Sequence, residues 1–213
     1  MPTYNPSTEL LADYAAGAAS PGTSLLIATH LTQAPESRAK VSELEAVGGA
    51  VLSQEPAAEM RPDALDKALA MLDAPCDADA SEPATNGESP LPRPVMEALG
   101  LTFSEIPWKF RLPGVSEYEF DGFGEEKVSI LRARPGAALP QHTHKGCEMT
   151  LVMTGALQDG EEVYRAGDLA VNDEDDDHRP QIVGEEICHC LVVMNGSLHF
   201  TGTFSRALNF LGE

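Results

Sequence analysis

The stretch QHTHKGCE, residues 141–148, gathers two histidines, a cysteine and a glutamate within eight positions. Side chains alternate between the two faces of a β-strand, so His142 and His144 point to the same face if this stretch is extended. A turn at the intervening KG pair would bring Glu148 back beside them. Two imidazoles and a carboxylate that converge in this way are typical ligands of a divalent metal.

A fourth candidate ligand lies further along the chain, where His178 follows Gly167 by eleven positions in GDLAVNDEDDDHRP. Three histidines and a glutamate suit Zn²⁺ in a closed tetrahedral site, or Fe²⁺, Mn²⁺ or Ni²⁺ in an octahedral site with open positions. A closed site would be structural, whereas an open one could bind substrate or oxygen. The sequence thus predicts one metal site, formed by His142, His144, Glu148 and His178, with both roles open.

Two further features near these residues allow more than one interpretation. Cys188 and Cys190 would lie on one face of a strand, too close in sequence for an unstrained disulfide. They could be redox-sensitive thiols near the metal, or small core residues, since buried cysteine is common. The acidic run DEDDD, residues 173–177, could hydrogen-bond a metal ligand or guide cations inward, but such runs are more often solvated loops.

The residues after Trp108 form short runs with strand character, separated by glycine, proline and aspartate turns. These runs are 128–134, 148–154, 168–172, 187–194 and 198–204. Many short strands at this spacing are typical of a β-sandwich or a β-barrel. We expect an all-β domain, residues 95–213, that positions the candidate ligands.

Apolar residues recur at helical spacing between residues 8 and 73, for example at Leu65, Leu69 and Leu72. Four such stripes predict a small four-helix domain at residues 1–75. The following segment is rich in alanine, aspartate, serine and proline and almost lacks large apolar side chains, which predicts a linker at residues 76–94. The expected fold class is therefore α + β in separate domains.

The composition limits the kinds of partner. Lysine and arginine number 14 against 34 aspartates and glutamates, and the resulting net charge of −20 disfavours direct binding to nucleic acid. No run approaches the roughly 18 apolar residues of a membrane span. The first residues lack the basic and apolar regions of a secretion signal. We expect a cytoplasmic protein with reduced cysteines and no membrane association.

The metal-type residues resemble the motifs of the cupin superfamily. The first motif, with its flanking glycines, matches at every position and spacing. In the second motif His178 keeps its expected spacing, but Asp173 and Asp175 stand where cupins usually have proline and glycine, and Ile182 replaces the usual asparagine. The resemblance implies a cupin barrel that holds a metal through the four candidate ligands.

The helical half resembles the zinc-binding anti-sigma factors, which carry a histidine near the N-terminus and then His-x3-Cys-x2-Cys at the start of a helix. In THLTQAPESRAK, His30 is followed at those spacings by Ala34 and Ser37, and Asn5 stands about where the first histidine belongs. Natural loss and deliberate replacement would both produce this pattern. Because a structural zinc site needs about four ligands, we expect no zinc in the helical domain.

The order of helical module, linker and single cupin domain resembles the ChrR-type anti-sigma factors of the singlet-oxygen response, along essentially the whole chain. This resemblance implies that the helical domain inhibits an extracytoplasmic-function sigma factor. It also implies a Zn²⁺ in the cupin domain, a need for that domain in releasing the sigma factor, and no enzymatic activity. The alternative is a metal-dependent cupin oxygenase or isomerase with a helical appendage, which predicts an open metal site and a substrate pocket.

Overall fold

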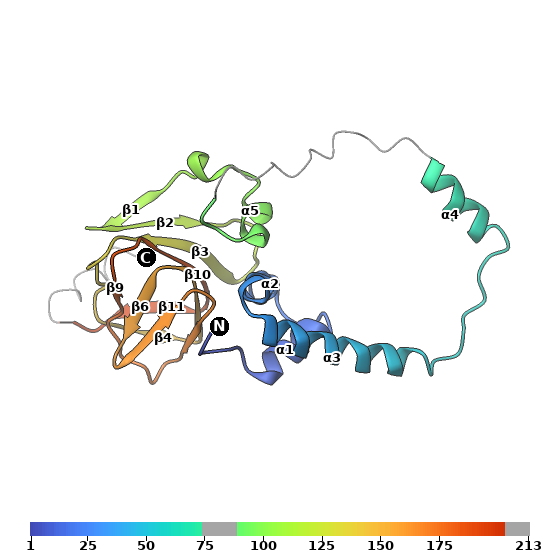
Figure 1. Cartoon of the computed structure of the whole chain (residues 1–213), viewed down its shortest axis with the longest axis horizontal. Helices are drawn as coiled ribbons and strands as arrows, with labels where there is room; N and C mark the ends of the chain where they lie inside the picture. The colour runs from blue at the N-terminus through green and yellow to red at the C-terminus, as the bar shows by residue number, and fades with distance from the viewer. Residues whose placement is uncertain (74–88, 203–213) are drawn as a thin grey trace.

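The computed structural model describes residues 1–73 and 89–202. Its first three helices lie at one side of a domain of β-strands (Figure 1). Five α-helices occur in these ranges: α1 (Thr8–Ala15), α2 (Pro21–Gln33), α3 (Pro35–Leu52), α4 (Ala64–Asp73) and α5 (Arg93–Leu99). A 3₁₀ turn, η1 (Phe103–Glu105), follows α5.

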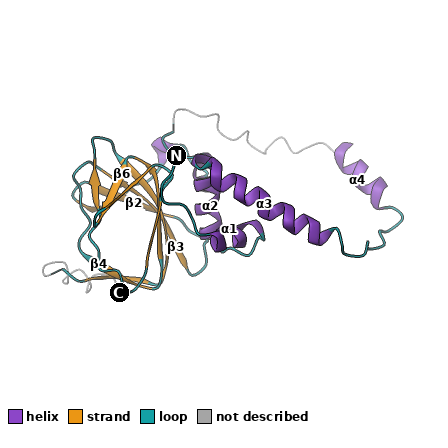
Figure 2. Ribbon diagram, turned by 60° about the horizontal axis from the view of Figure 1, so that its bottom comes forward, coloured by secondary structure: helices purple, strands orange, loops and turns teal. Residues whose placement is uncertain are grey.

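Helix α2 connects the other helices to the sheet. It begins at Pro21, a residue that suits the first turn of a helix because its missing N–H would have no partner there. Leu26 and Ile27 of α2 are fully buried. The helix contacts α1, α3 and α5 as well as β3, β5 and β10. Figure 2 shows α1, α2 and α3 together at one side of the strands. The helical side and the sheet therefore share one apolar core.

Helix α4 is the exception. Its large apolar side chains Leu65, Leu69, Met71 and Leu72 are all exposed, and Figure 1 shows the helix standing apart from the rest of the molecule. An amphipathic helix of this kind gains little stability alone, because most helical stability in proteins comes from packing of the apolar face.

Eleven β-strands occur in the described part of the chain. They are β1 (Lys109–Leu112), β2 (Val115–Glu119), β3 (Glu126–Ala133), β4 (His142–Lys145), β5 (Glu148–Thr154), β6 (Ala156–Asp159), β7 (Glu162–Arg165), β8 (Leu169–Asn172), β9 (Gln181–Val183), β10 (Cys188–Asn195) and β11 (Ser197–Phe200). They form a six-stranded sheet in the order β1-β2-β3-β10-β5-β8, a pair β11-β4 and a three-stranded sheet β7-β6-β9.

The two faces of the large sheet bury different residues. Because side chains alternate along a strand, Ile130 and Leu191 face the core that the helices share. Their neighbours Cys190 and Val192 belong to a second apolar cluster, on the other face, with residues of β6 and β9. Both faces of β5 and β10 are thus covered, which explains their nearly unbroken apolar sequences.

The sequence correctly predicts helices followed by a β-sheet domain. The number of helices differs from the expected four, because a fifth helix, α5, packs on α2. Residues 74–88 of the predicted linker lie outside the described residues, as does the end of the predicted strand 198–204. The described end of that linker, residues 89–94, includes the buried Leu91. No described helix has both the length and the apolar character needed to cross a membrane.

Candidate metal centre

Strands β4 and β5 place three of the four predicted ligands. His142 and His144 lie two positions apart in β4 and are both 1% exposed, and Glu148 begins β5. Gly146 makes the turn between them at φ 107°, and a Cβ there would lie 2.1 Å from the backbone oxygen of Asn195. This turn therefore requires glycine.

The backbone brings the fourth ligand to the same place. His142 and His178 form an isolated antiparallel bridge, with His142 N donating to His178 O at 3.0 Å and His178 N donating to His142 O at 2.9 Å. One ligand atom from each of His142, His144, Glu148 and His178 lies within 4.8 Å of the others. The structure thus assembles the four residues that the sequence singles out.

Hydrogen bonds orient two of the rings toward a shared point. Nδ1 of His142 donates to the backbone oxygen of Pro140 at 2.7 Å, and Nδ1 of His178 donates to the Asp159 carboxylate at 2.6 Å. A neutral imidazole that donates from Nδ1 keeps a free lone pair on Nε2. A carboxylate that orients a histidine in this way is typical of metal sites.

His144 completes the cluster. Its Nε2 lies 2.9 Å from Nε2 of His178, while its Nδ1 is buried without a hydrogen-bond partner among the described residues. The nearest carboxylate oxygen, Oε2 of Glu148, is 3.6 Å from that Nδ1. Two ring nitrogens that face each other at this distance either share a proton or both bind a cation.

The surroundings keep His142 and His144 in the neutral form, whereas Asp159 favours the charged form of His178. Burial lowers the pKa of His144 to about 4, with the neighbouring His142 and His178 acting in the same direction. Burial also lowers the pKa of His142. Burial opposes the charged form of His178 too, but the hydrogen bond and charge of Asp159 outweigh it and raise its pKa. Neutral imidazoles are the form that coordinates a metal.

Glu148 supplies the negative charge of the cluster. The carboxylate is 9% exposed, and burial raises its pKa, whereas His178 and a hydrogen bond from Thr150 oppose the shift. A buried carboxylate is costly unless a positive charge compensates it. The convergent donors, the unpartnered His144 nitrogen and this carboxylate all fit a divalent cation, which would polarise groups bound to it as a Lewis acid.

Asp159 is the residue of the site that the sequence analysis missed. The acidic run 173–177 was the sequence candidate for supporting a ligand, but its residues are exposed and bond mainly within their own loop and to neighbouring loops, for example Asp175 N to Asp173 Oδ1 at 2.9 Å. Asp159 sits at the end of β6 beside a turn glycine, where no sequence pattern distinguishes it from an ordinary turn residue.

A cavity of about 620 Å³ adjoins the candidate metal centre, and His142 and Glu148 contribute to its wall. Cys188 and Cys190 line it as well, with their Sγ atoms 3.5 Å apart. The hydrogen bond with Cys188, together with burial, raises the pKa of Cys190, so this thiol is protonated at neutral pH. The predicted redox role of the pair stays a prediction.

The degenerate zinc position in the helices is occupied by polar side chains in contact with one another. Nε2 of His30 lies 2.8 Å from Oγ of Ser37, which is 3.3 Å from Oδ1 of Asn5. Ala34 is 1% exposed and offers only a methyl group. One imidazole with an amide, a hydroxyl and a methyl does not fit the ligand set of a structural zinc.

The molecule therefore combines a β-domain, which holds a three-histidine, one-glutamate cluster, with a helical region that packs against it. Residues 97–198 match the family of ChrR cupin-like domains. The chain is 32% identical over 197 residues to the anti-sigma-E factor ChrR of Cereibacter sphaeroides, a match that spans 92% of each protein. The chain belongs to the ChrR family of anti-sigma factors.

The solved structures agree with this assignment. The fold is similar to that of a chain in the crystal structure of Rhodobacter sphaeroides SigE in complex with the anti-sigma ChrR, with a TM-score of 0.77 and 30% identity. The similarity covers 90% of this chain and 98% of the other. Both the helices and the β-domain are therefore included.

Proposed function

We propose that this protein is an anti-sigma factor that sequesters an extracytoplasmic-function sigma factor. We further propose that the β-domain, with Zn²⁺ at the four-residue cluster, is required for release of the sigma factor in response to singlet oxygen. The observation that carries the first proposal is the relationship to ChrR over 92% of the chain, in both the helical and the β regions. The relative's crystal structure contains the sigma factor SigE, which supports a partner of that class.

The surface of α3 and α4 supports such a partner. Val47, Val51 and Leu52 at the end of α3 are 63%, 59% and 72% exposed, and four large apolar side chains of α4 are exposed as well. These side chains lie on two helices that follow each other in the chain, and large exposed apolar side chains in such numbers indicate a surface that a partner covers. We name residues Val47, Val51, Leu52, Leu65, Leu69, Met71 and Leu72 the apolar arm.

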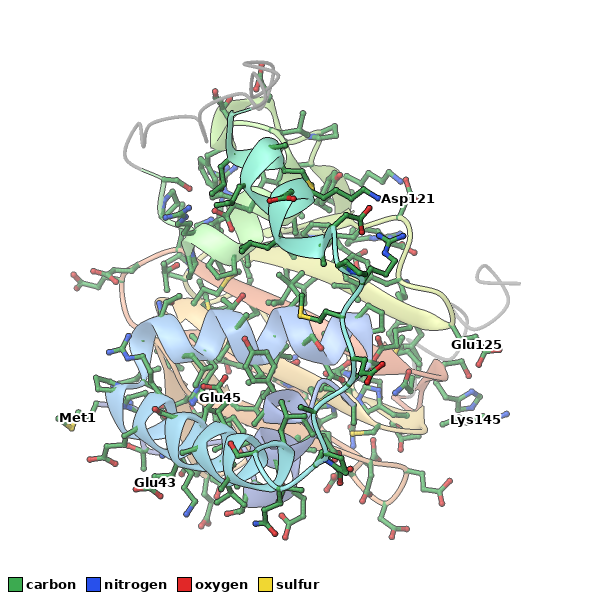
Figure 3. All side chains as sticks on the ribbon, turned by 90° about the vertical axis from the view of Figure 1, so that its right-hand side faces the viewer. Met1, Glu43, Glu45, Asp121, Glu125 and Lys145 are labelled. Atoms are coloured by element: carbon green, nitrogen blue, oxygen red, sulfur yellow. The ribbon has the colours of Figure 1, made fainter. Side chains whose placement is uncertain are left out.

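Charge adds to this argument. Exposed acidic residues, including Glu43 and Glu45, lie on the same helix α3 (Figure 3), and the whole chain carries a net charge of −20. A sigma factor presents basic surfaces that otherwise bind DNA and polymerase. An acidic helical surface with an apolar arm would attract and cover them.

The sigma factor proposal can be tested with the full-length chain. We expect the protein to inhibit transcription by its cognate sigma factor in a reconstituted assay. Replacing Leu69 and Leu72 with alanine should weaken inhibition about tenfold or more, because buried leucines contribute strongly to interfaces. Leu101→Ala, at a half-exposed leucine outside the arm, is the matched control. Unchanged inhibition by the double variant would contradict the proposed surface.

The predicted domain boundary leads to a second measurement. Because α3 and α4 carry the apolar arm, we expect the fragment 1–75 to bind and silence the sigma factor by itself. Inhibition by the full-length chain alone would contradict this boundary.

The metal proposal has its own measurement. His142→Ala with His144→Ala should abolish metal binding, as elemental analysis of the purified protein would show. His199→Ala removes an exposed histidine of β11 and is the control. Retention of one equivalent of metal by the double variant would refute the assignment.

A second candidate function is a metal-dependent cupin enzyme, an oxygenase or isomerase. The cavity beside His142 and Glu148 is the observation that favours it, because an enzyme needs room for a substrate at the metal. An enzyme would turn over a substrate in the absence of any sigma factor. The proposed regulator would bind its metal without turnover and form a tight complex with the sigma factor.

A further inference from the structure

The polarity of the wall changes along the length of the cavity beside the candidate metal centre. Strand register places Glu148 opposite Met194, then Thr150 opposite Val192, and then Val152 opposite Cys190. On the other side of β10, Ser129 lies opposite Val192. The wall therefore passes from a carboxylate, through a layer with two hydroxyl groups, to apolar side chains and thiols.

The apolar part of the wall is large. Leu131, Ala133 and Val115 come from the main sheet, and Leu157 and Ile182 come from the opposing sheet. A volume of about 620 Å³ is within the range of cavities that hold small molecules, roughly 300 to 1,000 Å³. An apolar cavity of this size, next to a few convergent polar groups, is typical of a ligand site.

One polar side chain in the middle layer has no partner. Ser129 is 3% exposed and lines the cavity, and its hydroxyl forms no hydrogen bond with another described residue. The hydroxyl of Thr150, in the same layer, is already used by the Glu148 carboxylate at 3.1 Å. Because Ser129 lines the cavity, its hydroxyl is available to hydrogen-bond a polar group of a ligand that enters it.

The charges of the wall indicate the sign of that ligand. Arg111 forms an ion pair with Glu117, and Arg111 and Lys127 both lie near Glu119, at 3.6 and 3.7 Å. The positive charges of Arg111 and Lys127 are therefore already neutralised by neighbouring carboxylates. A divalent cation held by three neutral imidazoles and one carboxylate would keep an excess positive charge at the end of the cavity where Glu148 lies, and an anion would neutralise it.

We propose that this cavity binds a small organic carboxylate with an apolar chain. Its carboxylate would bind at the metal cluster, within reach of the hydroxyl layer, and its chain would lie against Val192, Leu131 and Ile182. The inference rests on the metal site proposed above and is independent of sigma factor binding. The ChrR-type β-domain is thus a receptor for a small molecule as well as a metal site.

Octanoate is a suitable probe, with the full-length chain loaded with Co²⁺ so that ligand exchange at the metal is visible in the absorption spectrum. We expect octanoate to bind at one site by calorimetry and to shift the Co²⁺ bands. Octanol has the chain without the charge and acetate has the charge without the chain, and both should bind at least about tenfold more weakly. Equal affinity for all three, no binding, or binding that is unchanged without metal would overturn the proposal.

Two variants locate the site. Val192→Phe fills the middle of the cavity and should weaken octanoate binding by about tenfold or more, whereas the same change at Val171, an exposed valine of β8, should not. Ser129→Ala removes only the hydroxyl without adding bulk and should also weaken binding, which tests the site if the Val192 variant does not fold. Full affinity in both cavity variants would place octanoate elsewhere and refute the proposal. Sigma factor inhibition, measured on the same samples, shows separately whether the proposed function holds.

Discussion

Nδ1 of His30 lies 2.8 Å from the backbone oxygen of Gly167, and this contact joins α2 to the turn between β7 and β8. A carbonyl only accepts hydrogen bonds, so Nδ1 carries a proton. Burial lowers the pKa of His30, which favours the neutral ring, and Nε2 then accepts from Ser37. One neutral imidazole therefore connects the degenerate zinc position in the helices with the β-domain.

Ser37→Ala should destabilise the full-length chain by about 1 to 3 kcal/mol, because it leaves the buried Nε2 of His30 without a partner. Ser42→Ala, at an exposed position of the same helix, is the control and should change little. Urea denaturation of both variants provides the measurement. Equal stability of the two would show that the hydrogen bond between Ser37 and His30 does not support the fold.

The degenerate zinc position should bind zinc if the ligands of the anti-sigma motif are introduced. Asn5, His30 and Ser37 already meet there, and Ala34 is buried beside them. We expect Asn5→His, Ala34→Cys and Ser37→Cys together to add one equivalent of zinc by elemental analysis. The same chain with Ala34 retained has only three ligands and should lose its zinc to a chelator more readily.

This measurement is clearest in a chain that also carries His142→Ala and His144→Ala, so that the β-domain contributes no metal. Failure of the restored chain to bind zinc would mean that the four positions no longer share the ligand geometry. Zinc in the helices of the unaltered chain would contradict the expectation that this site is empty of metal.

Strong local patterns made much of the fold predictable from sequence. Strand β5 was expected at 148–154 and is found at Glu148–Thr154, and β10 was expected at 187–194 and is found at Cys188–Asn195. Both are long apolar runs. The contact of α2 with α5 and the sheet was not predicted, because it depends on tertiary packing between segments that lie far apart in the chain.

Some residues of the candidate site could likewise be predicted from the sequence and others could not. Its four ligands follow from motif spacing within two short stretches. The role of Asp159 depends on where β6 lies in space, since nineteen residues separate it from His178. In the sequence, Asn5 and Ser37 could be recognised only as residues that replace expected zinc ligands. Their contacts with each other and with His30, and the contact between His30 and Gly167, could be found only in the structure.

Asp159→Asn should weaken metal binding by about 10- to 100-fold, because the carboxylate orients His178 and makes its ring a stronger ligand. Asp177→Asn is the matched control: this exposed aspartate of the acidic run hydrogen-bonds Gln141 and lies outside the cluster. Competition with a metal chelator measures the affinity of each variant. A larger loss for Asp177→Asn than for Asp159→Asn would assign the supporting role to the acidic run instead.

Glu148→Ala should separate inhibition of the sigma factor from its release. The substitution removes the carboxylate of the metal cluster, whereas the apolar arm of α3 and α4 and the contact between His30 and Gly167 involve other residues. A ligand or metal shifts a conformational equilibrium only through a difference in its interactions with the two states. Without the metal that difference is lost, so binding should persist and release should fail.

A reporter strain that carries Glu148→Ala should therefore keep the sigma factor silent in the dark and respond little to light with a photosensitiser. His178→Ala should behave in the same way, and Glu161→Ala, at an exposed glutamate of the β-domain, should respond normally. Cys188 and Cys190 are the oxidisable side chains to replace next, because both line the cavity beside Glu148. A normal response by the Glu148 variant, with metal shown to be absent, would exclude a role of the metal in release.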